Sequence, residues 1–465
     1  MAEFSVNEII TAINGVLLYG KTSDIKVSGI VTDSRRDCSN ALFIPIRGEV
    51  FDGHDFLETA ANMGAPVILV EHQKEVPESV RTRCIVIGVD DTTRAYQALA
   101  NFHRRRFTDL KIVAVTGSSG KTSTKEMLRS IFSAAYGADA VLATEGNTNN
   151  QIGVPQNLLR LDKQHKVAVI EMGTNHHGEI EPLSLTTEPD VSVISFIGSC
   201  HLEFLGSIEG VAREKSCIFA GLKPGGTAVI PVSGGGQDIL EKKAASYKVI
   251  HFAGNHDADV SSRYLGGTLQ GSQMKLKFRQ TGEEFLVNWK LSGRHQASNA
   301  AAAAAAASAM GINGDKIVQG LEQCVLPGMR MKITEREGVT WVNDAYNANP
   351  DSVKASLEWL AEFIQPENFV LILGDMLEIG ENSVNEQLKV LKQALVLFPS
   401  ARIAAVGKEM CKASGQLNNS ETSAVMFFSD STCAVEPLGK VIKPGDTVFL
   451  KASRGIKLEI VEQSL

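Results

Sequence analysis

The sequence predicts an α/β protein of three domains. We expect a small N-terminal α/β domain, a central domain with the parallel sheet of a phosphate-loop ATPase, and a C-terminal doubly wound, Rossmann-like domain. The chain has 465 residues, which is too many for a single hydrophobic core. A glycine-rich turn near residue 117 separates a strand pattern from a helical pattern, and short apolar runs alternate with helical patterns in the last third. The domains are therefore expected over residues 1–105, 106–326 and 327–465.

The composition is that of a globular protein without a strongly charged surface. Hydrophobic residues make up 43% of the chain, charged residues 21%, and the formal net charge is −7, which argues against a broad nucleic-acid-binding surface. The N-terminus, MAEFSVNEII, lacks the pattern of a secretory signal, and no uncharged apolar run reaches the roughly 18 residues of a membrane span. The seven cysteines are scattered without CxxC pairing, which indicates free thiols. We expect a cytoplasmic protein with no membrane span and no nucleic-acid partner.

The strongest local pattern is KIVAVTGSSGKTSTKEMLR, from Lys111 to Arg129. An apolar β-branched run comes first and a helical pattern follows the glycine-rich turn, as in a phosphate-binding loop. Glycine lets the backbone approach an anion, and the N–H groups at the start of the helix point toward it. Lys121 would pair with the outer phosphates and the Thr122 hydroxyl would bind Mg²⁺. The residues expected at the nucleotide phosphates are Thr116, Gly117, Ser118, Ser119, Gly120, Lys121, Thr122 and Ser123.

This pattern matches the shorter form of the motif, G-x-x-G-K-[ST]. Val115 stands where the commoner form has another glycine. The alternative is a glycine-rich turn that only closes an ordinary βα unit. The flanking strand and helix favour phosphate binding.

Two further expected strands of the central domain end at residues that can bind a metal. The run KVAVIEM predicts a buried strand that ends on Glu171, at the position of a Mg²⁺ ligand beside a phosphate loop, although the carboxylate could instead cap the next turn. A third strand precedes GSCHLE, which contains His201. A single histidine is usually structural, but its place at a strand end favours function. Lys215 lies in the helical pattern GVAREKSCIF, where spacing alone does not select it.

The N-terminal domain carries polar residues at two expected strand ends. The runs IVTDSRR and LFIPIRGEVFDGH place Ser34, Arg35 and Arg47 where they could hold a diphosphate or a uracil. The residues alone leave open that the arginines are solvated surface charges. The helix expected from Thr93 to Arg106 leads into the next domain, and we expect its basic end, RRR, to be an exposed linker.

The remaining segments predict further elements of the second and third domains. Residues 220–292 show short alternating segments with glycine-rich turns, which predict a β-rich flap. The run GRHQASNAAAAAAAASAM predicts a helix packed closely against a sheet. In the C-terminal domain, NDAYNANP, GDMLEIG and KASRG follow expected strands, where doubly wound sheets bind ligands.

Taken together, these motifs resemble those of the Mur ligase family, the ATP-dependent amide-forming enzymes of peptidoglycan and cell-wall synthesis. The phosphate loop and GRHQASN are similar to the family in general. GNTNNQIGVP, EMGTNHHGEI, NDAYNANP and GDMLEIG resemble the members that join D-alanyl-D-alanine to a UDP-N-acetylmuramoyl tripeptide. The resemblance covers essentially the whole chain. It implies a monomeric carbon–nitrogen ligase that uses ATP and two Mg²⁺ ions and proceeds through an acyl phosphate.

The resemblance also implies roles for individual residues. Lys121, His201, Lys215 and Arg330 are expected at the reacting groups, with Arg330 closing over ATP from the C-terminal domain. Thr122, Glu171, His201 and a carbamylated Lys215 are expected around the Mg²⁺ ions. Asn299 is expected near the adenine and Asp344 near the ribose. The residues expected at the UDP-sugar peptide and the dipeptide are Ser34, Arg35, Arg47, Asn147, Asn149, Asn150, Tyr346, Asn347, Asn349 and Asp375.

Three positions depart from the family pattern. Gln296 stands where the family often has asparagine, which could rearrange the adenine contact. Gln387 appears near the place where relatives carry a histidine after GDMLELG, which affects the dipeptide pocket. Ala452 replaces a common glycine in KGSR.

Several other functions fit parts of the sequence. A sister ligase would add a single amino acid, but the DNPR-type motif of the diaminopimelate-adding relatives is absent. Folylpolyglutamate synthetase shares the expected fold but not the UDP motif. A non-catalytic scaffold would be favoured by the loss of Lys121, Glu171, His201 or Lys215, and all four are present. A phosphate-loop NTPase that couples hydrolysis to motion would need no amine acceptor. The third residue of the peptide, diaminopimelate or lysine, stays open.

Overall fold

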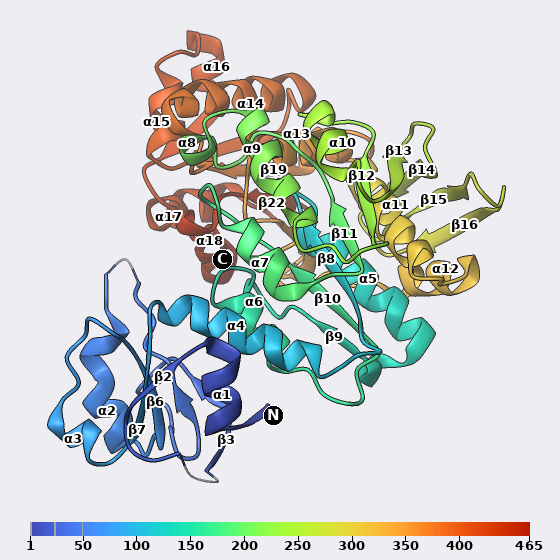
Figure 1. The fold of residues 1–465 in the computed structure, drawn as a ribbon. Helices are drawn as coiled ribbons and strands as arrows, with labels where there is room; N and C mark the ends of the chain where they lie inside the picture. Colours follow the sequence, from blue (N-terminus) through green and yellow to red (C-terminus); the bar gives the residue numbers. More distant parts are fainter. Residues whose placement is uncertain (1, 23–24, 49) are drawn as a thin grey trace.

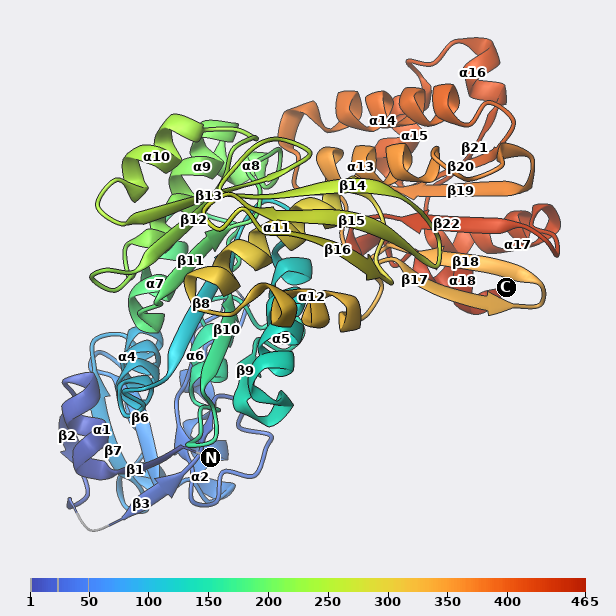
Figure 2. The same ribbon diagram turned by 90° about the vertical axis from the view of Figure 1, so that its right-hand side faces the viewer.

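The computed structural model describes residues 2–22, 25–48 and 50–465. Within these residues the strands form sheets of two, five, nine and six strands. Figure 1 and Figure 2 show the N-terminal region at one end, the large central sheet in the middle, and the C-terminal region on its other side. The predicted α/β class is confirmed.

The N-terminal region contains the two smaller sheets. β1 (Glu3–Ser5) pairs with β3 (Lys26–Ser28). The five-stranded sheet has the order β2 (Val16–Tyr19), β7 (Ile85–Val89), β6 (Val67–Glu71), β5 (Leu42–Phe43) and β4 (Ile30–Val31). Its helices are α1 (Val6–Ile13), α2 (Leu57–Asn62) and α3 (Glu78–Arg81). β6 and β7 are buried on both faces, which is why their sequences are continuous apolar runs.

Helix α4 (Thr92–Arg105) connects this region to the central sheet, and in its basic end Arg105 and Arg106 are exposed whereas Arg104 is buried. Arg104 is 5% exposed and donates hydrogen bonds to the carbonyl oxygens of Thr187 and Glu188, at 3.1 and 3.0 Å. Those carbonyls lie at the end of α7 (Ile180–Thr187), where a helix leaves acceptors unpaired. The prediction of an exposed basic end was therefore wrong for Arg104, which is buried because it binds these distant acceptors.

The central sheet is parallel over most of its width. In spatial order its strands are β9 (Val141–Ala143), β10 (Val167–Glu171), β8 (Lys111–Thr116), β11 (Val191–Ile194), β12 (Thr227–Pro231), β13 (Lys248–Gly254), β14 (Val260–Thr268), β15 (Gly271–Phe278) and β16 (Glu284–Trp289). Only the pairs β14–β15 and β15–β16 are antiparallel among these strands of the described chain. The segment expected as a β-rich flap is rich in strands, and it extends the main sheet because β12 and β13 continue its parallel ladder.

Helices cover both faces of the central sheet. They are α5 (Lys121–Tyr136), α6 (Gly153–Leu158), α7, α8 (Leu202–Leu205), α9 (Ile208–Ser216), α10 (Gln237–Ala244), α11 (Arg294–Ala309) and α12 (Gly314–Gln323). α11 carries the alanine run, and Ala300 to Ala307 are fully buried. It packs against β13, β14 and α5, as the small side chains predict. The segment GNTNNQIGVP is too polar and rich in glycine to suggest a helix, yet α6 begins inside it at Gly153.

The C-terminal sheet has the order β17 (Lys332–Arg336), β18 (Val339–Asn343), β22 (Thr447–Lys451), β19 (Phe369–Gly374), β20 (Arg402–Val406) and β21 (Val425–Phe428). β17 is antiparallel to β18, and the other pairs are parallel. The helices are α13 (Pro350–Leu360), α14 (Ser383–Leu397), α15 (Lys408–Ser414), α16 (Asn419–Ser423), α17 (Ser431–Val441) and α18 (Glu459–Ser464). Separate apolar cores lie on the two faces, as in a doubly wound sheet.

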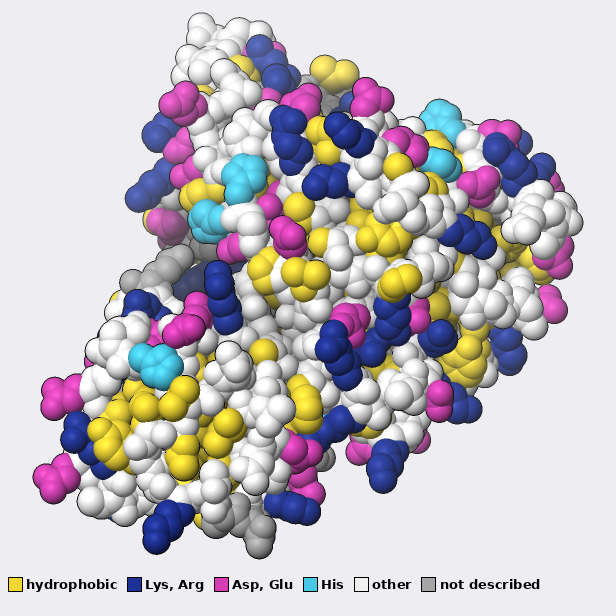
Figure 3. All heavy atoms as spheres, in the orientation of Figure 1, with side chains coloured by type: hydrophobic (Ala, Val, Ile, Leu, Met, Phe, Trp, Pro, Cys, Tyr) yellow, Lys and Arg dark blue, Asp and Glu magenta, His cyan; other side chains and the backbone are white. Residues whose placement is uncertain are grey.

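The surface carries both signs of charge. Figure 3 shows basic and acidic side chains interspersed over the face in view. Of the helices in the described part of the chain, none combines the length and the apolar character that a bilayer crossing requires.

We expect Arg104→Met to destabilise the protein by about 2 kcal/mol, because it removes hydrogen bonds from a charged donor to two backbone acceptors. Urea unfolding followed by circular dichroism measures this change. Arg94→Met is the matched control on the same helix, since the Arg94 side chain is 86% exposed. Equal unfolding midpoints for the two variants would contradict the structural role of Arg104.

Candidate active site

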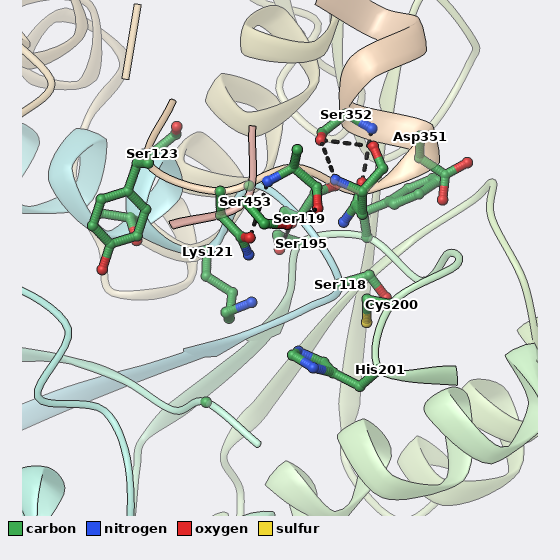
Figure 4. Close-up of a pocket in the computed structure, with 18 of the residues that line it drawn as sticks. Ser118, Ser119, Lys121, Ser123, Ser195, Cys200, His201, Asp351, Ser352 and Ser453 are labelled. Carbon is green, nitrogen blue, oxygen red and sulfur yellow. Dashed lines mark hydrogen bonds between the residues drawn. The ribbon is translucent and has the colours of Figure 1, made fainter. Parts of the chain in front are cut away.

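A cavity of about 880 Å³ lies where the central and C-terminal regions meet. The carboxyl ends of the parallel strands in both sheets supply most of its wall, as expected for α/β proteins. Figure 4 shows the side chains of Lys121 and His201 approaching the same open space. The predicted residues that line it are Ser118, Ser119, Gly120, Lys121, Thr122, Ser123, Asn147, Asn149, Asn150, Glu171, His201, Asn299, Arg330, Asp344, Tyr346, Asn347 and Asn349.

The phosphate loop is the turn between β8 and α5. Gly120 has a φ of +81°, and a Cβ there would collide with Asn299 Oδ1, so no other residue fits without rearrangement. Among the described residues, no side chain caps the first N–H groups of α5, which leaves them for an anion. Lys121 Nζ donates to Gly117 O at 2.7 Å, so the ammonium lies over the loop.

Thr122 and Glu171 form the part of the site that fits Mg²⁺. Thr122 Oγ1 donates to Glu171 Oε2 at 2.9 Å, and Asn149 Nδ2 donates to Glu171 Oε1 at 2.8 Å. Within the described residues, no three His, Cys, Asp or Glu side chains gather closely enough to hold a metal by themselves. A hydroxyl and a carboxylate nevertheless suit Mg²⁺, which commonly takes its other ligands from water and substrate phosphates.

The buried ion pair of Lys125 and Glu126 is linked to the backbone of Glu171 through Thr144. Lys125 is 1% exposed, pairs with Glu126, and donates to Thr144 O at 2.9 Å. Thr144 Oγ1 in turn accepts a hydrogen bond from Glu171 N at 2.9 Å. The helix that begins at the phosphate loop therefore also fixes the strand end that carries the carboxylate.

Lys215, on α9, is fully buried, and its Nζ has no hydrogen-bond partner within the described residues. Burial lowers the pKa of Lys215 to about 8, with smaller effects from Cys200 and Lys121. An amine in this state is partly neutral near physiological pH and therefore nucleophilic toward CO₂. A buried polar atom without a partner is costly, and a carbamate would add acceptor oxygens at this place. Lys215 thus fits the carbamylation that the family resemblance implies, although it does not line the cavity.

Arg330 reaches the phosphate loop from the C-terminal region. Its Nη2 donates to Thr122 Oγ1 at 3.1 Å, and its guanidinium lies 3.6 Å from the centroid of the Tyr346 ring. Arg330, which was predicted to close over ATP, therefore lies beside the phosphate loop. Lys451 Nζ lies 2.5 Å from Asp344 Oδ2, so the carboxylate at the expected ribose position is held by a buried cation.

The side of the cavity expected to hold adenine contains Asn299, Gln296 and also His295, which the sequence patterns did not predict as a site residue. Asn299 Nδ2 donates to Gln296 Oε1 at 3.2 Å, so the departure from the family pattern orients Asn299 directly. His295 also lines the cavity, and burial lowers the pKa of its imidazole to about 4. It is therefore neutral at physiological pH. The motif GRHQASN contained this histidine, but only the packing of α11 beneath the cavity singles it out.

Two carboxylates of the C-terminal region contact the loop after β11, and neither was predicted. His201 Nδ1 lies 2.5 Å from Glu378 Oε2, and this hydrogen bond lowers the pKa of Glu378. Ser199 N donates to Asp351 Oδ2 at 2.8 Å. These contacts join separate regions of the chain, so no local pattern could reveal them.

The predicted residues of the N-terminal region lie away from this cavity. Arg35 pairs with Asp33 at 2.8 Å and is exposed, and the pair lowers the pKa of Asp33 to about 2. Arg47 pairs with Glu71 at 2.8 Å, and Ser34 is buried. The structure thus places these three residues in a separate part of the molecule, and their role stays a prediction.

Asp375 and Gln387 also lie outside the cavity lining. Asp375 accepts hydrogen bonds from the backbone N–H groups of Glu409 and Met410 at the start of α15, at 3.1 and 2.8 Å. Burial raises the pKa of its carboxyl. Gln387 is fully buried and bonds to Met376 N and Met376 O, at 3.3 and 2.9 Å. Asp375 thus caps α15 and Gln387 holds the backbone of Met376, so contact of Asp375 with a dipeptide stays an untested prediction.

Comparisons with known proteins show the family. Residues 115–307 match the Mur ligase middle domain, residues 329–454 match the Mur ligase, glutamate ligase domain, and residues 26–104 match the Mur ligase family, catalytic domain. The chain belongs to the Mur ligase family, whose members are ATP-dependent ligases. The resemblance seen in the motifs is confirmed.

Individual relatives share the full length of the chain. The UDP-N-acetylmuramoyl-tripeptide–D-alanyl-D-alanine ligase of Bacillus subtilis (strain 168) is 32% identical and covers 100% of this chain and 99% of its own. A crystal structure of MurF from Acinetobacter baumannii is 30% identical, with a TM-score of 0.91 and coverage of 100% and 99%. The MurF ligase from Thermotoga maritima, solved in complex with ADP, is 25% identical, with a TM-score of 0.80 and coverage of 94% and 97%.

We expect Gly120→Ala to weaken ADP binding by at least ~10-fold, because a methyl group at this position displaces Asn299 and blocks the approach of a phosphate to the backbone. Isothermal titration with ADP and Mg²⁺ measures the affinity. Gly137→Ala is the matched control, since Gly137 also has a positive φ but a Cβ there meets nothing within 4 Å. ADP binding equal to the wild type in both variants would remove Gly120 from the nucleotide site.

Proposed function

We propose that this protein ligates D-alanyl-D-alanine to a UDP-N-acetylmuramoyl tripeptide at the expense of ATP, giving the UDP-N-acetylmuramoyl pentapeptide for peptidoglycan synthesis. The relative from Bacillus subtilis has the name of this activity and aligns over its whole length, and the two solved structures described above are MurF enzymes. The observation that carries the proposal is the shared cavity. It brings the phosphate loop, the amide loop around Asn149 and the NDAYNANP loop around one space.

The first step transfers the γ-phosphoryl group of ATP to the terminal carboxylate of the tripeptide. Two anions must approach each other, so positive charge is needed between them. Lys121 over the phosphate loop and Arg330 beside Thr122 supply it. Thr122 and Glu171 would hold Mg²⁺, which neutralises phosphate charge when it is bound. We propose that His201 and a carbamylated Lys215 complete a second metal position.

The second step is attack of the dipeptide amine on the acyl phosphate, with loss of inorganic phosphate. Substrate positioning is the main contribution that the chain can make here, because three substrates must be aligned. We propose that Tyr346, Asn347 and Asn349 hold the dipeptide, since their loop faces the phosphate loop across the cavity. Asn147, Asn149 and Asn150 would orient the carboxylate end of the tripeptide.

The N-terminal region would hold the UDP group. Ser34, Arg35 and Arg47 supply hydrogen-bond donors there, and the two arginines are exposed enough to exchange Asp33 and Glu71 for a diphosphate. The three regions 1–105, 106–326 and 327–465 would then each bind one substrate. We propose that the enzyme acts as a monomer in the cytoplasm, where ATP is available.

The direct test is phosphate release from ATP, with UDP-muramoyl tripeptide present and D-alanyl-D-alanine present or absent. We expect release only with both substrates and a UDP-pentapeptide by mass spectrometry. Lys121→Ala should lower turnover by roughly 10³-fold, because charge stabilisation in phosphoryl transfer is lost, while binding of the UDP substrate persists. Release with a single amino acid would make the protein a sister ligase, and release without any acceptor would leave only nucleotide hydrolysis.

Lys215 gives a separate prediction about CO₂. With a pKa of about 8, half of the Lys215 amines are neutral at pH 8, whereas an ordinary lysine is almost fully charged there. We expect ¹³C-bicarbonate added to CO₂-depleted enzyme at pH 8 to produce a carbamate signal by NMR and to raise ligase activity several-fold. Lys215→Met should show neither effect. A wild-type enzyme that gains activity without a carbamate signal, or a fully active Lys215→Met variant, would reject carbamylation.

A further inference from the structure

The loop from Gly198 to His201, between β11 and α8, is fixed at its first residue by the phosphate loop. Ser118 Oγ donates to Gly198 O at 3.1 Å and accepts from Gly198 N at 2.9 Å. Because both bonds use the same hydroxyl, a shift of Gly198 also shifts Ser118. We call residues 198–201 the relay loop.

Two further residues of the relay loop, Ser199 and His201, are held by the C-terminal region. Asp351 Oδ2 accepts the hydrogen bond of Ser199 N at 2.8 Å, and Glu378 Oε2 lies 2.5 Å from His201 Nδ1. Asp351 belongs to the first turn of α13, and Glu378 belongs to the loop after β19. Two carboxylates from two separate elements therefore hold one short loop of the central region.

The local backbone is adapted to these contacts. A Cβ at Gly198 would collide with Asp351 Oδ2, so a glycine is required for the carboxylate to reach Ser199 N. His201 and Glu378 have φ values of 51° and 62°, which is an unfavourable left-handed conformation for residues other than glycine. Because His201 and Glu378 contact each other, we infer that their contact stabilises both of these backbone conformations.

We propose that Asp351 and Glu378 are positioning residues that form a two-carboxylate clamp on the relay loop and couple docking of the C-terminal region to the geometry of the phosphate and metal site. The Glu378 carboxylate can only accept a hydrogen bond, so it holds a proton on His201 Nδ1, and in the neutral form of the ring this leaves the lone pair of Nε2 available to a ligand. Asp351 fixes Ser199 and, through Gly198, the Ser118 hydroxyl. The clamp rests on the proposed function only for the identity of that ligand, a divalent cation with a nucleotide.

The clamp explains how a metal ligand in one region can depend on a substrate loop in another. The GDMLEIG loop carries Glu378, and the same loop lies against α8, where a Cβ at Gly380 would be 3.2 Å from Glu203 Cα. When the C-terminal region is undocked, the His201 ring loses its partner and can take either tautomer. His201 is then no longer fixed as an acceptor at Nε2, so the metal site is complete only in the docked arrangement.

The first measurement is the tautomer of His201 in full-length protein labelled with ¹⁵N-histidine, by long-range ¹H–¹⁵N NMR at pH 8, with His201→Gln for assignment. We expect the Nδ1–H form in the wild type and a large population of the Nε2–H form in Glu378→Ala. Glu378→Gln should restore Nδ1–H, because its carbonyl oxygen accepts the same hydrogen bond. Asp351→Ala should leave the tautomer unchanged.

The second measurement is binding of Mn²⁺ in the presence of ADP, by the electron paramagnetic resonance signal of free Mn²⁺. We expect about a 10-fold loss of affinity in Glu378→Ala, partial recovery in Glu378→Gln and a several-fold loss in Asp351→Ala. Glu381→Ala is the matched control, since Glu381 is an exposed carboxylate in the same segment. Its affinity should match that of the wild type.

The outcomes separate the clamp from the proposed function. An Nε2–H tautomer of His201 in the wild type would overturn the clamp, and so would wild-type Mn²⁺ affinity in both Glu378→Ala and Asp351→Ala. Failure of the wild type to bind Mn²⁺ with ADP would instead count against the proposed function. In that case the tautomers of the wild type, Glu378→Ala and Glu378→Gln still decide whether Glu378 positions His201.

Discussion

The hydrogen bond between Thr122 and Glu171 is the constraint on which the rest of the site depends. It joins the first turn of α5 to the last residue of β10, and it exists because Glu171 pairs in register with Val115 on the neighbouring parallel strand. A slip of one residue would turn the carboxylate to the other face of the sheet. The register of two buried strands therefore fixes the oxygen atoms that suit Mg²⁺ beside the loop that suits phosphate.

Basic side chains around this hydroxyl and carboxylate supply positive charge without covering the site. Lys121 and Arg330 approach from the loop and from the C-terminal region, and Lys125 is buried on α5 in an ion pair with Glu126. Lys125 is buried, whereas Lys121 and Arg330 line the cavity, and this difference in burial gives them different roles. The buried lysine holds strand ends in place, whereas the cations that line the cavity are available to a substrate with several negative charges.

Local patterns predicted those features whose cause is local. GSSGKT predicts its own turn because glycine conformation and the following helix are set within a few residues, and Glu171 was found because it ends an apolar strand. Lys215 could not be selected in this way, since its isolation from partners depends on elements packed around α9. Arg104, Asp351 and Glu378 act on atoms that lie far away in the sequence. Their roles required the packed structure, as did the recognition that Asp375 caps α15.

The alanine helix α11 has a consequence for the loop that it faces. From Ala300 to Ala307 its buried side chains stop at Cβ, so this part of the surface that packs against α5 has no rotamers and loses no side-chain entropy when the protein folds. Such a surface cannot adjust to a bulkier neighbour by turning a side chain, and any displacement must move a whole helix. The alanine run of α11 therefore forms a rigid support for α5 and the phosphate loop. Substitutions in this run would be poorly tolerated even where no substrate contacts it.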